Sequence, residues 1–287
     1  MFLLYIYAPI GFYYLTIAVL PFVIASAVYP LKDSAQPKWT KSFATWVVSH
    51  AKRYFKLKVI MKDEDALFAD KRPLLFSMEP HDVLPISIFW PIAGAFRNRQ
   101  ARGAMTSAIF AVPIIKHVYV WMSACDAAKG NLMRLMKEGM SINICPGGVR
   151  EVLYLGDRAK KTLFLKKRLG FTKLAMASGA RIVPTFIFGQ DKLYDYYISK
   201  NSFLVSIGRK LGFAPIIFFG VGGLPMGPPK SSPITVIVGK PIDVPHTDNP
   251  TQEELQKYHQ LFIDETVRLY EDHKDKYDMK DVLLVIE

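Results

Sequence analysis

The hydrophobic pattern divides the chain into an uncharged N-terminal stretch and a longer part in which apolar and polar runs alternate. Residues 1–30 contain no charged side chain and are rich in aromatic and aliphatic residues. About 20 apolar residues suffice for a helix to cross a bilayer, although Pro9, Gly11 and Pro21 would also suit a hairpin that enters and leaves on one side. We therefore predict a retained membrane anchor over 1–30, spanning or re-entrant, and one further domain over 31–287.

Basic residues follow this apolar stretch at once. They are Lys32, Lys38, Lys41, Lys52, Arg53, Lys56 and Lys58. Positive charge next to a membrane segment favours the cytosolic side. We expect the body of the protein to lie there.

Beyond the anchor, helical and strand-like patterns alternate. Helical periodicity marks 39–55, 131–138, 171–178 (closing at Gly179) and a charged segment from 251 to about 274, which opens with the capping box Thr251 and Glu254. Short apolar runs typical of buried strands occupy 57–61, 73–78, 141–145, 181–188 (interrupted by Pro184) and 234–238. This alternation predicts an α/β fold with a central mixed sheet flanked by helices.

Three further apolar segments fit neither pattern well. Residues 83–96 and 108–122 are mostly apolar but contain prolines, so we expect buried or half-immersed helices without an uninterrupted span. Residues 213–229 are dominated by Phe, Ile, Gly and Pro, which favours an apolar loop near the bilayer.

Composition narrows the partners. The formal net charge of +12 favours anionic partners. Nucleic acid is disfavoured, because no helix-turn-helix, zinc-finger or RNA-binding signature organises the basic residues, and a lipid surface fits better. The only two cysteines, Cys125 and Cys145, are too few for a disulfide framework and are not spaced as a metal site.

The first candidate for chemistry is His81, which follows the predicted strand 73–78 and has Glu79 and Asp82 beside it. Imidazole has a pKa suited to accepting a hydroxyl proton during acyl transfer. A lone histidine is more often structural, and His50, His117, His246, His259 and His273 keep that interpretation.

A glycine turn forms the second candidate, where residues 146–151 read PGGVRE. Gly147 and Gly148 would let main-chain N–H groups approach an oxyanion or a phosphate, and Arg150 adds a planar cation. Glu151 could accept a hydrogen bond from the imidazole and fix its tautomer, or it could be a solvated surface carboxylate.

A basic run forms the third candidate. It contains Lys160, Lys161, Lys166, Lys167 and Arg168 and leads into Gly170. Such a run is usually a solvated face, yet cations followed by a helix N-terminus would also seat the phosphates of coenzyme A.

In this order the motifs resemble the type-2 diacylglycerol acyltransferase family, which includes monoacylglycerol and wax-ester acyltransferases. Residues 79–85 read EPHDVLP, 146–151 read PGGVRE, and 168–171 read RLGF, with Val183-Pro184 and Gly189-Gln190 downstream. The Glu-Pro-His opening resembles plant and algal members, whereas animal and fungal relatives usually show His-Pro-His-Gly. Asp82 departs from both, since a small residue is typical there.

The resemblance implies His81 as the catalytic base and the glycine loop with Glu151 as part of the site. The wider glycerol-phosphate acyltransferase superfamily pairs its histidine with an aspartate five residues later, where this chain has Ile86. We therefore expect Glu151, or less readily Asp82, to orient the imidazole. Arg150 stands where phosphate-using relatives seat the acceptor phosphate, so lysophosphatidate stays open as an acceptor.

These points together predict an acyl-CoA:diacylglycerol O-acyltransferase. His81 and Glu151 are its expected catalytic residues, and its expected substrate-binding residues are Glu79, Pro80, Asp82, Gly147, Gly148, Arg150, Lys167, Arg168 and Gly170. We expect acyl-CoA as co-substrate, no metal or redox cofactor, and a place in the endoplasmic reticulum membrane or on lipid droplets, with a homo-oligomer possible. The alternatives are another acceptor (monoacylglycerol, a long-chain alcohol or lysophosphatidate) and a non-catalytic lipid-binding protein.

Overall fold

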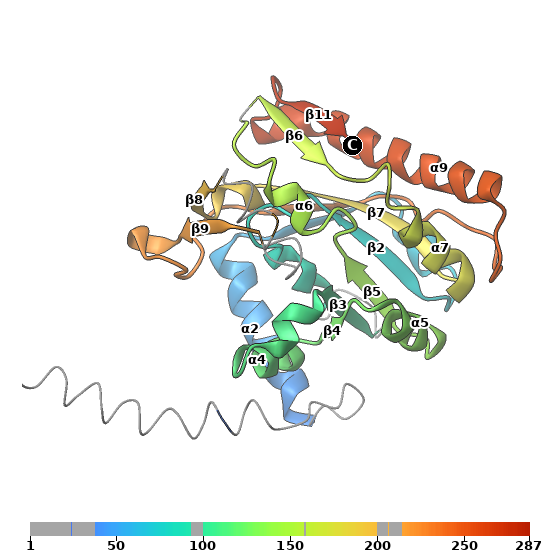
Figure 1. The fold of residues 1–287 in the computed structure, drawn as a ribbon, viewed down its shortest axis with the longest axis horizontal. Helices are drawn as coiled ribbons and strands as arrows, with labels where there is room; N and C mark the ends of the chain where they lie inside the picture. The colour runs from blue at the N-terminus through green and yellow to red at the C-terminus, as the bar shows by residue number, and fades with distance from the viewer. Residues whose placement is uncertain (1–23, 25–37, 93–99, 158, 200–205, 207–213) are drawn as a thin grey trace, which may run out of the picture.

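A seven-stranded mixed sheet forms the centre of the computed structural model, which describes residues 24, 38–92, 100–157, 159–199, 206 and 214–287 (Figure 1). Its order is β1 (Lys58–Met61), β10 (Thr235–Val238), β7 (Arg181–Phe188), β2 (Leu74–Glu79), β5 (Ser141–Ile144), β3 (Ala101–Met105) and β4 (Ala124–Asp126). β2 pairs in parallel with both β5 and β7, whereas β10 is antiparallel to β7. The predicted α/β class with a mixed sheet is confirmed.

Helices cover both faces of this sheet. One face carries α5 (Lys129–Lys137), α7 (Leu169–Ser178) and α9 (Gln252–Glu271), and the other carries α2 (Lys38–Tyr54), α3 (Glu64–Phe68) and the 3-10 helix η1 (Ile86–Ile92). Along β7, Ile182 and Phe186 pack under α7 and α9, while Val183 and Ile187 pack on the opposite side. This is the period-2 alternation of a strand buried on both faces. Figure 1 shows α9 and α2 on opposite sides of the sheet.

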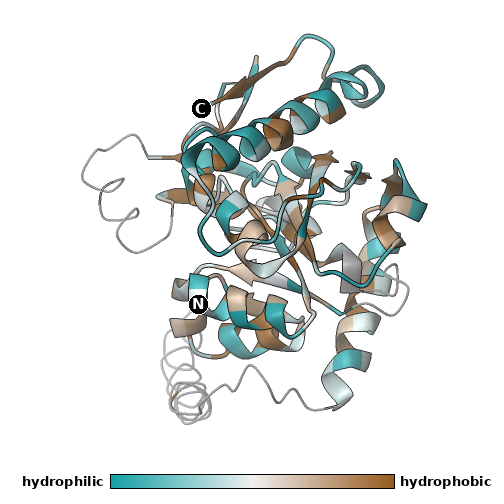
Figure 2. Ribbon diagram, turned by 90° about the vertical axis from the view of Figure 1, so that its right-hand side faces the viewer, coloured by the Kyte–Doolittle hydropathy of each residue, from teal (hydrophilic) through white to brown (hydrophobic). Residues whose placement is uncertain are grey.

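Local signals set the ends of the long helices. Thr251 accepts a hydrogen bond from the Glu254 N–H, and Glu254 reaches back to the Thr251 N–H, so the predicted capping box is present. Gly179 ends α7 in the left-handed conformation, with φ of 69°. α9 buries Phe262 and Tyr270 on one side, and it alternates teal and brown along its length in Figure 2.

Short elements complete the fold. They are η2 (Ser107–Ala111), α4 (Ile115–Trp121), α6 (Val149–Val152), η3 (Gln190–Lys192), η4 (Val221–Gly223) and η5 (Lys274–Tyr277), with the strand pairs β6 (Lys160–Leu163) and β11 (Leu283–Ile286), and β8 (Asp195–Ile198) and β9 (Ile216–Phe219). The segment 108–122 thus forms two short helices, η2 and α4, separated at Pro113, which lacks an N–H to donate; the expected interruption is present.

Two expectations about irregular backbone were wrong. The segment 213–229 contains β9, which pairs with β8; a partner distant in sequence supplies the hydrogen bonds that local composition cannot reveal. β7 also continues through Pro184. The Pro184 carbonyl still accepts the Gly239 N–H at 2.8 Å, so the proline removes only a donor.

The predicted anchor, 1–30, lies outside the described residues except for Ile24. Within the described part of the chain, no helix is both long and apolar enough to cross a bilayer. The anchor therefore stays a prediction.

Candidate active site

Three neighbouring strands deliver the candidate residues to one edge of the sheet. β2 ends at Glu79 and leads into His81, β5 leads into the glycine turn that precedes Glu151, and β7 leads into Gln190. Because β2 is parallel to both neighbours, these carboxyl ends lie together, at the edge where α/β sheets commonly carry their sites. The fold thus brings together segments about 70 and 110 residues apart.

The His81 imidazole is held by the main chain of its own neighbour. Its Nδ1 lies 2.9 Å from the carbonyl oxygen of Asp82. A carbonyl can only accept, so Nδ1 carries the hydrogen and Nε2 keeps its lone pair. Burial lowers the pKa of His81, although the Asp82 carbonyl acts in the opposite direction. The ring is therefore uncharged at neutral pH.

Glu151 contacts His81 through the main chain and not through the ring. Its Oε2 accepts the His81 N–H at 3.0 Å, and its Oε1 accepts the Phe164 N–H at 2.9 Å. The expected bond from the imidazole to Glu151 is therefore absent, because the Asp82 carbonyl already occupies Nδ1. Residues 80–87, which contain His81, are called the histidine turn below. Glu151 links the main chain of this turn to that of Phe164, directly after β6.

The glycine turn makes room for this carboxylate. A Cβ on Gly147 would lie 1.7 Å from Oε1 of Glu151, closer than any side chain could tolerate. Gly148 has φ of 61° and ψ of −154°, a conformation that L residues avoid. Gly147 is thus required by the position of the Glu151 carboxylate, and Gly148 by its own backbone conformation. The expected role of both glycines toward an oxyanion stays a prediction.

Glu79 lies under the turn and lines neither of the two cavities described below, in contrast to its expected contact with substrate. Its side chain is fully buried, and its carboxyl group interacts electrostatically with that of Glu151. Burial and the Glu151 charge raise the pKa of Glu79 well above its ordinary value. Burial likewise raises the pKa of Glu151 to about 7, against the effect of the His81 and Phe164 N–H groups.

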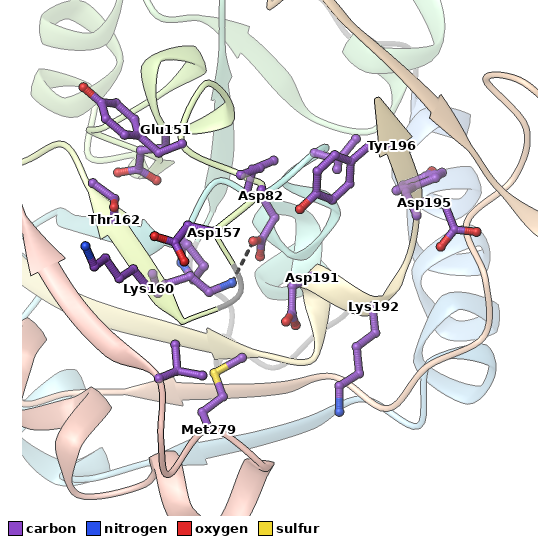
Figure 3. A pocket seen from close by; sticks show the side chains of 18 of the residues that line it. Asp82, Glu151, Asp157, Lys160, Thr162, Asp191, Lys192, Asp195, Tyr196 and Met279 are labelled. Carbon is purple, nitrogen blue, oxygen red and sulfur yellow. Dashed lines mark hydrogen bonds and ion pairs between the residues drawn. The ribbon is translucent and has the colours of Figure 1, made fainter. Parts of the chain in front are cut away.

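The Asp82 side chain lines a polar cavity to which His81 does not contribute (Figure 3). Its Oδ1 accepts a hydrogen bond from Nζ of Lys161 at 2.9 Å, and the two side chains are only 2% and 11% exposed. Asp82 has φ of 51°, in the left-handed region that glycine adopts most easily. The residue that departs from the family pattern is therefore one half of a buried ion pair.

This polar cavity, of about 690 Å³, is poorly suited to phosphate. Pro80 contributes to its wall, and its charged lining comprises the carboxylates Asp82, Glu151, Asp157, Asp191, Asp195 and Asp278 and the cations Lys160, Lys161 and Lys192. Carboxylates thus outnumber lysines. Lys160 and Lys161 were expected to attract the phosphates of coenzyme A. In this cavity, however, carboxylates surround the two lysines, and their negative charge would repel a phosphate.

The remaining basic candidates separate. Arg168 lines an apolar cavity, donates to the Gly147 carbonyl at 2.9 Å and lies over the Phe164 ring. Lys167, Gly170 and Arg150 are exposed and line neither cavity. Arg150 lies over the same ring, with its guanidinium carbon 4.9 Å from the centroid of Phe164.

His81 opens on that apolar cavity, which also measures about 690 Å³. Its lining combines apolar side chains of η1, η2 and the segment 214–226 with Gly148, Cys145 and Arg168. Volume and lining fit a lipid-sized ligand with a few polar groups at one end. Within the described part of the chain, no cluster of His, Cys, Asp and Glu is arranged to hold a metal ion.

Gln190 lies beside the candidate site, and the sequence analysis assigned it no role. It is 2% exposed; its amide N donates to the carbonyls of Pro80 and His81 at 3.1 and 3.3 Å, and its amide O accepts the Ser87 N–H at 3.0 Å. It therefore fixes both ends of the histidine turn. The available signal was the Gly189-Gln190 pair that follows the end of β7 at Phe188.

Comparison with known proteins points to one family. The family model described as diacylglycerol acyltransferase matches residues 4–287. Diacylglycerol O-acyltransferase 2 of Mus musculus is 29% identical over 272 residues, 87% of this chain and 68% of that protein. Acyl-CoA wax alcohol acyltransferase 1 of Mus musculus is 29% identical over 268 residues, 86% and 79% of the two chains.

Among solved structures, the 1-acyl-sn-glycerophosphate (LPA) acyltransferase PlsC from Thermotoga maritima matches with a TM-score of 0.48 and 15% identity, over 89% of this chain and 93% of that one. The family match covers nearly the whole sequence, including all three motifs. The chain therefore belongs to the diacylglycerol acyltransferase family.

Proposed function

We propose that this acyltransferase transfers an acyl group from acyl-CoA to diacylglycerol and so makes triacylglycerol. The observation that carries the proposal is the position of His81, a neutral imidazole with a free Nε2 at the polar end of an apolar cavity. Family membership supports the reaction class. Family membership does not identify the acceptor, because the names of the relatives include both diacylglycerol and wax alcohol. Diacylglycerol as the acceptor is therefore our proposal.

In the proposed reaction, Nε2 of His81 accepts the proton of the acceptor hydroxyl as its oxygen attacks the thioester carbonyl. The tetrahedral intermediate collapses, the C–S bond breaks, and the coenzyme A thiolate takes the proton back from Nε2. The Nδ1–H bond to the Asp82 carbonyl supports this role because it holds the ring and stabilises the imidazolium that forms in between. Gly148 would place a main-chain N–H near the oxyanion.

Cys145 gives little support to an acyl-enzyme route. Cys145 lines the same cavity as His81, but burial raises the pKa of the thiol well above its usual value. A thiol needs a thiolate to be a nucleophile. Direct transfer to the acceptor is therefore the proposed path.

A membrane surface fits the face around the apolar cavity. Trp39 and Trp46 of α2, Val118 of α4 and Met226 are exposed, and Met226 also lines the cavity. Trp39 packs on Trp121 of α4, so α2 and α4 form one surface. Exposed apolar groups beside a lipid-sized cavity support substrate entry from a membrane, which we propose to be the endoplasmic reticulum or a lipid droplet.

The test is acyl transfer by membranes that contain the protein, with labelled acyl-CoA and separate acceptors. We expect triacylglycerol from diacylglycerol, and a loss of about 10²–10⁴-fold in His81→Gln, the usual contribution of a general base. His246→Gln, which changes an exposed histidine, should retain activity.

Normal activity of His81→Gln at matched expression would overturn the role of the base. Labelled wax ester or phospholipid as the main product would replace diacylglycerol with a long-chain alcohol or lysophosphatidate. No product from any acceptor would favour a lipid-binding protein without catalysis.

A further inference from the structure

The carboxyl groups of Glu79 and Glu151 meet beneath the histidine turn. Glu79 is fully buried and Glu151 is 2% exposed. Glu151 has a donor for each oxygen, the N–H groups of His81 and Phe164. Glu79 has a long contact of 3.4 Å from the Ser77 hydroxyl to Oε1, and the Gly147 N–H also acts on its carboxyl group, but its Oε2 has no hydrogen-bond partner.

An acceptor-only carboxylate would leave Oε2 of Glu79 unsatisfied in the protein interior, which is costly. Two ionised carboxylates in contact would also repel each other with no water to screen them. One proton on the pair removes both problems, because a protonated carboxyl is a donor as well as an acceptor.

The proton belongs on Glu79. Glu151 already receives two main-chain N–H bonds, and such bonds favour the ionised form. At Glu79 the Gly147 N–H and the Ser77 hydroxyl favour the ionised form, but burial and the Glu151 charge outweigh them and raise its pKa well above the ordinary value, whereas the bond from Glu79 acts to lower the pKa of Glu151. The other ionisable groups that act on the pair are Arg168, Asp82 and Cys145.

We propose that Glu79 is a positioning residue, a protonated acid that donates its hydrogen to Glu151, so that the ionised Glu151 holds the main chain of His81 in place. This inference rests on the proposed role of His81. It assigns Glu79 to a part of the site that no substrate touches. The glycine at 147 belongs to the same device, because any side chain there would displace the Glu151 carboxylate.

The assignment predicts an asymmetry between two substitutions that both remove a charge. Glu79→Gln keeps a donor toward Glu151, so activity should stay within about threefold of wild type. In Glu151→Gln the amide NH₂ must face one of two main-chain N–H donors, so activity should fall by about tenfold to hundredfold. Equal losses in both variants, or the reverse order, would overturn the proposal.

The pH profile separates positioning from mere packing. Because the imidazole pKa is lowered, we assign the acid limb of activity to Glu151, whose pKa is about 7. Glu79→Leu removes the hydrogen bond that lowers the pKa of Glu151, so the acid limb should move to higher pH, while Glu79→Gln should leave it in place. An unmoved limb in Glu79→Leu contradicts the proposal.

A spectroscopic measurement keeps this inference distinct from the proposed function. At a pH well above 7, where Glu151 is ionised, the infrared difference between wild type and Glu79→Gln should show the carbonyl band of a protonated carboxylic acid in wild type alone. The band is expected whichever acceptor the protein uses, and also if it transfers no acyl group. Absence of the band would overturn the assignment of the proton even where the activity assay succeeds.

Discussion

At the scale of single residues, the histidine turn is stabilised by main-chain contacts. The Asp82 carbonyl orients the His81 ring, Glu151 and Gln190 bind the main chain on either side, and the Asp82 side chain faces the opposite way toward Lys161. Asp82 thus serves His81 through its carbonyl, a group that every residue has. This explains how an unusual side chain can stand next to His81 without changing the contacts of the imidazole.

The Asp82–Lys161 pair gives the residue-scale prediction. Burial raises the pKa of Asp82, while Lys161 opposes the shift, and Asp82 in turn raises the pKa of the lysine against its own burial. Lys161→Met would leave a buried carboxylate alone and should lower the free energy of unfolding by about 3–5 kcal/mol. Thermal or denaturant unfolding in detergent measures it.

Two further variants provide the controls. Lys230→Met breaks the exposed pair with Asp195 and should cost about 0–1 kcal/mol. Asp82→Gly combined with Lys161→Met removes both charges and suits the positive φ, so it should recover most of the loss. A double variant as unstable as Lys161→Met would show that the buried charge is not the cause.

At the scale of elements, the site depends on strand ends and on the order of strands. β2 lies between β5 and β7, so its C-terminal turn is within reach of a loop from each neighbour. The outer helices stabilise this arrangement from a distance, and α9 does so by covering β7 with Phe262 and Tyr270. Loss of stability in α9 should therefore be separable from loss of chemistry.

The capping box of α9 gives the element-scale prediction. Thr251→Ala removes the acceptor for the Glu254 N–H and should reduce the free energy of unfolding by about 1 kcal/mol. Thr251→Ser keeps the hydroxyl and should unfold like wild type. Acyl transfer at permissive temperature should be unchanged in both. Equal destabilisation by Ala and Ser would mean that the methyl group, and not the cap, is responsible.

At the scale of the whole molecule, the two helical layers differ in what they expose. The layer of α2 and α4 presents Trp39, Trp46 and Val118 beside the apolar cavity, whereas α9 on the other face exposes mainly polar residues. Lys41 and Arg53 are exposed on α2 and would add attraction to anionic lipid. We therefore expect the protein to face a bilayer with the α2 layer.

Vesicle binding tests this orientation. Trp46→Glu should weaken binding of the full chain to anionic vesicles by about tenfold, since burial of one large apolar side chain contributes about 1.5–3 kcal/mol. Leu261→Glu changes a side chain of similar exposure on α9 and should bind like wild type. Equal weakening by the two substitutions would contradict the orientation.

Much of the fold was predictable because it follows from local patterns. The apolar run before His81, the helix with hydrophobic periodicity over 39–55 and the Thr251 cap each act over a few residues, and the structure confirms all three. The motifs also predicted that His81, Gly147 and Glu151 would share one site. Short strands such as β9 were missed because their partners are distant in the chain.

The sequence by itself determined the fold class and the family, and it predicted that His81, Gly147 and Glu151 belong to one set of neighbouring residues, because periodicity, caps and motif order are local features of the chain. Only the tertiary structure decided which atoms of that set meet. The Asp82 carbonyl, and not Glu151, holds the ring; Lys161 is paired with Asp82; Gln190 joins the turn. Those contacts depend on the pairing of β2 with β5 and β7, and main-chain acceptors carry no sequence signal.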